Sequence, residues 1–81
     1  MNVRVLAFAR VRELLGAPER GLELADGARV GDAWTALERD CPALSEIAAS
    51  TRLARNGRIA AAGDSLCDGD ELALLPPVGG G

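Results

Sequence analysis

Apolar and polar residues alternate near the start of the chain, from Val3 to Phe8. A period of two among residues that favour β-structure predicts a strand with one face in a core. One face of this strand would carry Val3, Val5 and Ala7, and the other Arg4, Leu6 and Phe8.

Two short elements are expected next. Residues 11–15 are helix formers followed by a glycine and a proline, which predicts a helix of one or two turns. Residues 21–25 place two leucines on one side, and Asp26-Gly27 then forces a turn. We therefore expect a second strand, antiparallel to the first.

The longest periodic pattern predicts a helix that begins at Val30. Its apolar positions are spaced four, three, four and three residues apart, which places them on one face of an amphipathic helix. Pro42 is expected to end this helix and to leave residues 43–50 as a separate short turn. Arg29 stands where a capping Ser or Thr would be expected, so Asp32 is left to complement the helix dipole. The stripe consists of Val30, Trp34, Leu37, Cys41 and Leu44.

The second half of the chain predicts a hairpin and a final strand. Asn56-Gly57 is the commonest two-residue hairpin signal, and it separates residues 53–55 from residues 58–60. Residues 71–75 follow another tight turn and read as a strand. Pro76-Pro77 must end that strand, because neither proline can donate a hydrogen bond to a ladder.

These elements predict the fold class. A sheet with one apolar face needs a helix to cover it. The order strand, strand, long helix, short strands and final strand is that of the ubiquitin-like β-grasp fold, in which the first and last strands lie side by side at the centre of a mixed sheet. We expect an α+β fold in a single domain over residues 1–81, because a chain of 81 residues has no room for a second, with a flexible tail at residues 78–81.

Composition narrows the function. The apolar fraction of 48% and the charged fraction of 26% are typical of a globular domain. The net charge of -3, with arginines scattered among acids, argues against nucleic-acid binding. No apolar run approaches the ~20 residues of a membrane span, and the start of the chain does not resemble a signal peptide. A cytoplasmic location is expected.

Side chains that could carry chemistry are few. The chain has no histidine and no tyrosine, so the usual general bases are missing, and two cysteines without histidine argue against a zinc site. We interpret Trp34 and Cys41 as core residues, and nothing near Cys67 suggests an activated thiol. No phosphate-binding loop is present, so no cofactor is expected on this chain.

Both ends of the chain resemble one known family. The segments VRVLAFARVRELLG and DGDELALLPPVGGG resemble the small subunit of molybdopterin synthase, the sulfur carrier of molybdenum cofactor biosynthesis. The region between them keeps the family's length, so the resemblance covers essentially the whole chain. Two positions depart from the family pattern: Leu74-Leu75 replaces aromatic residues, and Gly79 stands where another residue is common. These departures bear on partner affinity.

The resemblance implies that the working group is the carboxyl of Gly81. A separate adenylyltransferase, related to ubiquitin-activating enzymes, would use ATP to form an acyl-adenylate, and sulfur would replace the adenylate to give a thiocarboxylate. The large subunit of molybdopterin synthase would accept the tail in a heterotetramer and pass the sulfur to cyclic pyranopterin monophosphate. The chain would be a sulfur-donating subunit of a transferase and would supply no catalytic side chain.

The resemblance also implies which residues meet the partners. Gly79 and Gly80 would thread a channel too narrow for a Cβ, and the two prolines would stiffen the exit of the tail. Pattern alone leaves open whether the three apolar residues that match the family's contact patch are interface or core. The expected partner-binding residues are Phe8, Ile59, Leu75, Pro76, Pro77 and Val78.

Three alternatives stay open. A carrier for thiamine thiazole or for tungsten-pterin synthesis would share the fold and the Gly-Gly end. A ubiquitin-like modifier would use the activated glycine to acylate lysines of other proteins. A plain interaction module would have an inert tail, and deleting the glycines would leave its partner function intact.

Overall fold

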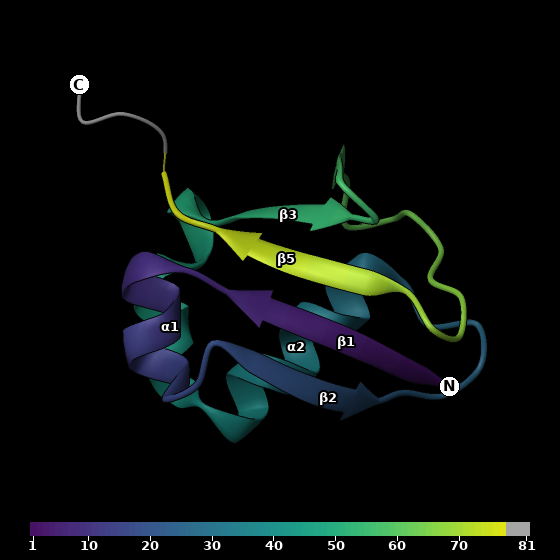
Figure 1. Cartoon of the computed structure of the whole chain (residues 1–81), viewed down its shortest axis with the longest axis horizontal. Helices are drawn as coiled ribbons and strands as arrows, with labels where there is room; N and C mark the ends of the chain where they lie inside the picture. The colour runs from purple at the N-terminus through teal and green to yellow at the C-terminus, as the bar shows by residue number, and fades with distance from the viewer. Residues whose placement is uncertain (78–81) are drawn as a thin grey trace.

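The computed structural model describes residues 1–77, which form a mixed sheet of five strands with α2 lying against one face (Figure 1). The strands lie in the order β2-β1-β5-β3-β4. The elements are β1 (Asn2–Ala7), α1 (Ala9–Leu15), β2 (Glu19–Glu23), α2 (Val30–Asp40), the 3₁₀ helix η1 (Pro42–Ser50), β3 (Arg52–Arg55), β4 (Arg58–Ala60) and β5 (Glu71–Leu75).

The first and last strands lie side by side at the centre, as predicted. β1 and β5 are parallel, and Val5 is in register with Leu72. β2 runs antiparallel to β1 on one side, and β3 runs antiparallel to β5 on the other. This arrangement confirms the ubiquitin-like α+β fold. It also holds β5, which leads into the tail, between two neighbouring strands.

The core lies between the sheet and α2. The buried faces of β1 and β5 meet one stripe of α2, which includes Val30, Ala33 and Leu37. Trp34 and Cys41, interpreted as core residues from the stripe, are only half-buried at its margin. The Trp34 indole nitrogen donates to Glu38 at 2.8 Å. The apolar stripe of an amphipathic helix is wider than the strip of residues that the sheet buries completely, so residues at the edge of the stripe stay in contact with water.

The start of α2 is capped by backbone groups. The Val30 and Gly31 N–H groups donate to the carbonyls of Asp64 and Ala62, at 2.9 and 2.8 Å. The Asp32 carboxylate accepts from the Arg29 N–H at 2.8 Å, so the acid at this position does more than complement the dipole. A Cβ at Gly31 would lie 3.2 Å from Ala62, which explains the glycine at this close approach. The missing capping side chain therefore leaves no orphan donor here.

The local predictions hold with shifted boundaries. α1 runs from Ala9 to Leu15 and is followed by Gly16, whose φ of 84° is the left-handed conformation expected of a terminal glycine. The expected turn after Pro42 is the 3₁₀ helix η1. Asn56 and Gly57 both have positive φ, at 48° and 84°, as a two-residue hairpin turn requires.

The predicted flexible tail, residues 78–81, lies outside the described residues. No helix within residues 1–77 is long and apolar enough to cross a membrane.

Candidate docking surface beside the tail

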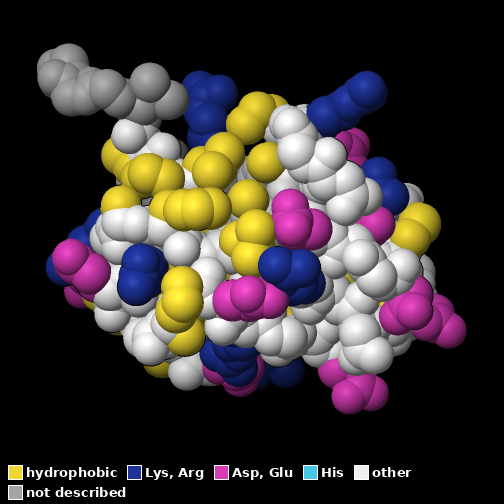
Figure 2. Space-filling model, viewed as in Figure 1, with side chains coloured by type: hydrophobic (Ala, Val, Ile, Leu, Met, Phe, Trp, Pro, Cys, Tyr) yellow, Lys and Arg dark blue, Asp and Glu magenta, His cyan; other side chains and the backbone are white. Residues whose placement is uncertain are grey.

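The face of the sheet opposite α2 carries an exposed apolar surface. Side chains alternate along a strand, so the residues between the buried positions of β1 and β5 point to this open face. Hydrophobic side chains gather there beside the last described residues of the chain (Figure 2). We call this surface the apolar half-face, and it consists of Leu6, Phe8, Ala54, Ile59, Ala73 and Leu75. Phe8 and Ile59 are its exposed members, Ala54 is buried, and the others are half-buried.

Cross-strand register brings these residues together from four strands. Leu6 pairs with Ala73, and Ala73 pairs with Ala54. Ala54 in turn pairs with Ile59 on β4. The row therefore crosses β1, β5, β3 and β4, although its members are far apart in the sequence. Small alanines in the middle and larger residues at the ends make the row a shallow apolar surface.

The sequence pattern left open whether Phe8 and Ile59 are core or surface residues, and their exposed fractions answer this question. Phe8 is 45% exposed and Ile59 is 60% exposed, so neither is a core residue. Leu75 is half-buried. Large apolar side chains that stay this exposed and lie near one another are typical of an interaction surface.

The junction between β1 and α1 holds Phe8 at the surface. Phe8 is still extended, with φ of -131°, and Ala9, the first residue of α1, adopts a φ of 49°. A non-glycine residue in the left-handed region is strained by contact of its Cβ with the backbone. The strain lies at the first residue of α1, directly after the exposed Phe8.

The described chain leaves the sheet at Pro76-Pro77, beside the apolar half-face. Pro76 is half-buried and Pro77 is exposed, so the chain rises away from the core directly after Leu75. Arg52 is the cross-strand partner of Leu75, and its side chain forms no ion pair within residues 1–77. The place where the chain leaves the sheet after Leu75 therefore combines an apolar surface with the positive charge of Arg52. The predicted site residues Val78, Gly79, Gly80 and Gly81 lie outside the described residues.

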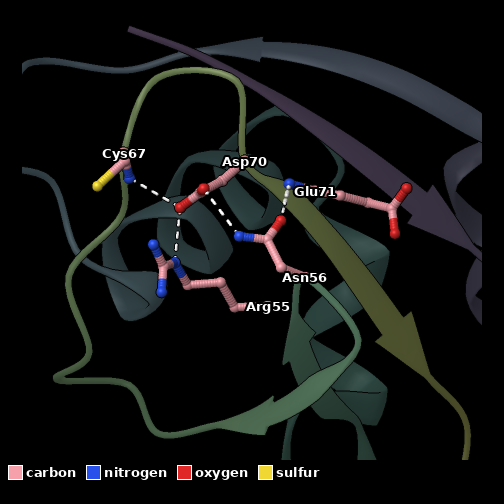
Figure 3. Close-up of polar contacts among 5 residues, drawn as sticks. All are labelled: Arg55, Asn56, Cys67, Asp70 and Glu71. Carbon is pink, nitrogen blue, oxygen red and sulfur yellow. Dashed lines mark hydrogen bonds and ion pairs between the residues drawn. The ribbon is translucent and has the colours of Figure 1, made fainter.

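A buried carboxylate anchors the start of β5 (Figure 3). Asp70 is 6% exposed and is the buried charged residue among residues 1–77. Its carboxylate accepts hydrogen bonds from Arg55 Nε at 2.6 Å, from Asn56 Nδ2 at 3.0 Å and from the Cys67 N–H at 2.8 Å. Asn56 Oδ1 accepts from the Glu71 N–H at 2.9 Å. The β3–β4 turn is thus tied to the residue at which β5 begins.

These contacts set the ionisation of the pair. Burial by itself would raise the pKa of Asp70, but the hydrogen bonds from Asn56, Cys67 and Arg55 outweigh it and hold that pKa below its usual value. The hydrogen bond to Asp70 raises the pKa of Arg55. Both groups are therefore charged at neutral pH, and their role is to hold the turn.

The cysteines show no arrangement for chemistry. Cys41 is half-buried, and its thiol donates to the Leu14 carbonyl at 3.1 Å, which links the end of α2 to α1. Cys67 is exposed. No group of three or more His, Cys, Asp or Glu side chains within residues 1–77 could hold a metal ion.

Sequence reasoning missed two features of this region. Leu6, Ala54 and Ala73 were not identified as part of the surface, because their meeting depends on register between strands. Asp70 was seen only as part of a turn. Its sequence signal, an acid between a glycine and a strand, says nothing about Arg55, which lies 15 residues earlier in the chain.

Comparison with known proteins relates this geometry to a family. The ThiS family matches residues 5–81. The molybdopterin synthase sulfur carrier subunit of Chlamydomonas reinhardtii is 37% identical over 83 residues, covering all of both chains. The small archaeal modifier protein 1 of Haloferax volcanii is 39% identical over 82 residues, covering 91% of this chain and 94% of its own. Its crystal structure matches with a TM-score of 0.89 at 36% identity over the whole of both chains.

A further match is a complex. Subunits 1 and 2 of the molybdopterin-converting factor of Helicobacter pylori have been solved together, and the matching chain is 26% identical with a TM-score of 0.71 over all of both chains.

Proposed function

The chain belongs to the ThiS family, and from that premise we propose that it is a sulfur carrier for molybdopterin synthesis that works through the carboxyl of Gly81. The observation that carries this proposal is the position of β5. The strand is held between β1 and β3, and it leads past an exposed apolar half-face straight into Pro76-Pro77 and the glycines. A partner that binds the half-face would receive the tail in a defined direction.

The chemistry requires activation by another protein. A carboxylate resists nucleophiles, so the adenylyltransferase transfers AMP from ATP to the Gly81 carboxylate and releases pyrophosphate. A hydrosulfide equivalent then attacks the carbonyl carbon, the bond to the AMP oxygen breaks, and a thiocarboxylate, AMP and a proton result. The thiocarboxylate sulfur bonds to a carbon of the pterin substrate and displaces an oxygen group from it, which gives a thioester. Water then attacks the carbonyl carbon, the carrier's C–S bond breaks, the sulfur stays on the substrate, and the carrier returns to a carboxylate. Two carriers would supply the two sulfurs of the dithiolene.

The partner is a larger subunit that binds cyclic pyranopterin monophosphate and supplies the catalytic side chains. Support comes from the Helicobacter pylori relative, which is solved as a complex of subunits 1 and 2. The apolar half-face is a suitable contact for such a subunit, because a buried apolar anchor is the usual source of affinity in an interface. We place the activity in the cytoplasm and the assembly in a heterotetramer.

The test is reconstitution from purified components. The chain is incubated with the adenylyltransferase, ATP and sulfide, and intact-mass spectrometry should show one oxygen replaced by sulfur at the terminal residue. The loaded carrier, mixed with the large subunit and cyclic pyranopterin monophosphate, should then yield molybdopterin. Sulfur found on Cys41 or Cys67 in place of the terminal carboxyl would refute the mechanism, and activity only in a thiazole-forming assay would move the chain to thiamine synthesis.

A second function is protein modification. The relative from Haloferax volcanii is named a modifier, and an acyl-adenylate can be attacked by an amine as well as by sulfur. Omitting sulfide from the same mixture and adding cell extract tests this function: amide conjugates that carry the Gly81 carbonyl would demonstrate it.

A further inference from the structure

All the basic side chains of this protein are of one kind. Lysine and arginine together number 9, and the sequence contains 9 arginines, from Arg4 to Arg58. A lysine amine can lose its proton and attack an activated carbonyl. A guanidinium stays protonated and delocalised, so it is not an acyl acceptor under the same conditions. The side chains of this protein therefore offer charge without offering an amine.

The remaining primary amine is the α-amino group of Met1, and the fold holds it. Its ammonium donates a hydrogen bond to the Leu24 carbonyl at 2.7 Å and faces the Asp26 carboxylate at 3.6 Å. The Met1 side chain is 5% exposed, and the residue as a whole is partly buried. Leu24 also donates its N–H to the Met1 carbonyl at 2.9 Å, so the terminus is paired in both directions. The nitrogen is therefore engaged in these two contacts, and an incoming carbonyl reaches it only when they open.

The other nucleophiles would not give a stable product. An exposed thiol such as Cys67 could take an acyl group, but a thioester stays activated and exchanges with other thiols. Serine and threonine hydroxyls are weak nucleophiles unless a neighbouring base activates them. The chain has no histidine to serve as that base.

We infer that this protein is a one-way acyl donor: its activated carboxyl can be transferred to other molecules, and a second copy of the chain is not an acceptor. The inference rests on the proposed activation at Gly81. In the step concerned, an amine nitrogen attacks the acyl-adenylate carbon, the C–N bond forms, the bond to the AMP oxygen breaks, and AMP and a proton leave. Any conjugate made by this protein would carry single copies and no chains of copies. A loaded carrier would also survive at high concentration without coupling to itself.

The first test needs no activating enzyme. Native protein is pulsed at neutral pH with an N-hydroxysuccinimide ester, an activated acyl group that reacts with amines, and the label is located by intact-mass and peptide mass spectrometry. Arg58→Lys and Arg39→Lys serve as matched variants, because each keeps the charge at an exposed position outside the apolar half-face. We expect each variant to be labelled at its new lysine, and the parent at least about tenfold more slowly, because Met1 must first open locally. Rapid labelling of the parent at Met1 would overturn the inference.

The second test uses the adenylyltransferase and ATP without sulfide, at high carrier concentration. The parent should form the acyl-adenylate and no covalent dimer, whereas the lysine variants should form a dimer lighter than two chains by one water. Addition of N-acetyl-lysine amide checks that the activated carboxyl acylates a free amine. A dimer of the parent would overturn the inference. So would lysine variants that stay monomeric while the small amine is acylated, because missing amines would then not be the cause.

The two tests separate the inference from the proposed function. If no acyl-adenylate forms at all, activation at Gly81 is wrong. The labelling experiment still reports whether the surface of the chain is free of reactive amines.

Discussion

Asp70 illustrates how one residue can connect several elements of the sheet. Its carboxylate binds Arg55 and Asn56, and its own backbone carbonyl accepts from the Arg4 N–H at 2.8 Å. One residue thus joins β1, the β3–β4 turn and the start of β5. Because buried carboxylates are costly unless fully hydrogen-bonded, the value of this residue depends on all its partners being present.

Replacing Asp70 with Asn should destabilise the fold by about 1–3 kcal/mol, because the amide leaves buried donors without their acceptor. The lowered pKa of Asp70 adds a pH dependence. Folding favours the ionised form, so this contribution is fully present above the unfolded pKa of about 3.9 and is lost as pH falls through the folded pKa. Urea unfolding between pH 7 and pH 3 should show a steeper loss in the parent than in Asp70→Asn.

Asp68→Asn is the matched control, since Asp68 lies in the same turn with an exposed side chain. Equal pH dependence in the parent and in Asp70→Asn would show that Asp70 does not ionise as its contacts indicate.

Ala9 carries the other notable backbone feature at this scale. Glycine adopts a φ of 49° without strain, so Ala9→Gly should leave the free energy of unfolding unchanged or raise it by up to about 1 kcal/mol. In the regular helix α2, Ala36→Gly should instead lower it by about 1 kcal/mol. Chemical denaturation of both variants measures the difference. If Ala9→Gly is as damaging as Ala36→Gly, the left-handed conformation at Ala9 is wrong.

At the scale of elements, the sheet separates two tasks. The faces of β1 and β5 toward α2 are fully apolar and hold the molecule together. The opposite faces carry the apolar half-face, whose larger members stay exposed because no helix of the described chain covers them (Figures 1 and 2). Neighbouring positions on one strand therefore alternate between the buried core and the apolar half-face.

Ile59→Glu should reveal this division. At a position that is 60% exposed, the change should alter stability by less than about 0.5 kcal/mol. It should weaken binding to the large subunit by about 2 kcal/mol, as loss of an apolar anchor does. The buried Leu74 offers the contrast, because Leu74→Ala should cost about 2–5 kcal/mol of stability. Thermal melts and calorimetric titration together give both quantities, and unaltered affinity in Ile59→Glu would remove β4 from the interface.

For the whole molecule, the proposed mechanism assigns docking to the apolar half-face and reaction to the carboxyl of Gly81, so the number of residues between Leu75 and Gly81 matters. A partner that holds the apolar half-face also holds Pro76-Pro77, and the carboxyl must then reach a fixed point. One residue spans at most ~3.6 Å, which is large compared with the placement that a reaction tolerates.

Deleting Gly81 should therefore abolish molybdopterin formation without changing the melting temperature. Gly79→Ala is the length-matched control, because it ends in the same Gly-Gly as the deletion but keeps the parental reach. We expect the control to retain more activity than the deletion, and its loss relative to the parent measures how strongly a Cβ at position 79 obstructs the narrow channel. If the deletion variant forms molybdopterin at the parental rate, the length of the tail does not matter, and the carboxyl does not need to reach a fixed point.

The sequence by itself determined the elements and their class. The alternation in Val3–Phe8, the stripe that begins at Val30 and the Asn56-Gly57 turn are local signals, and each is read from neighbouring residues. Their order was sufficient for the β-grasp fold, because a sheet with one apolar face and one amphipathic helix has few ways to pack. The start of α1 and both ends of β2 lie two residues earlier than predicted, whereas α2 begins at Val30 as predicted although backbone groups replace the expected capping side chain.

Only the tertiary structure decided which apolar residues are exposed and which acid is buried. Leu6 and Ile59 belong to one surface because β5 and β3 lie between their strands in a particular register. Asp70 is buried because Arg55 and Asn56 are brought to it across the β3–β5 pair. Each of these facts depends on residues distant in sequence. A one-residue shift of register would send every side chain to the other face, so no local pattern could have contained them.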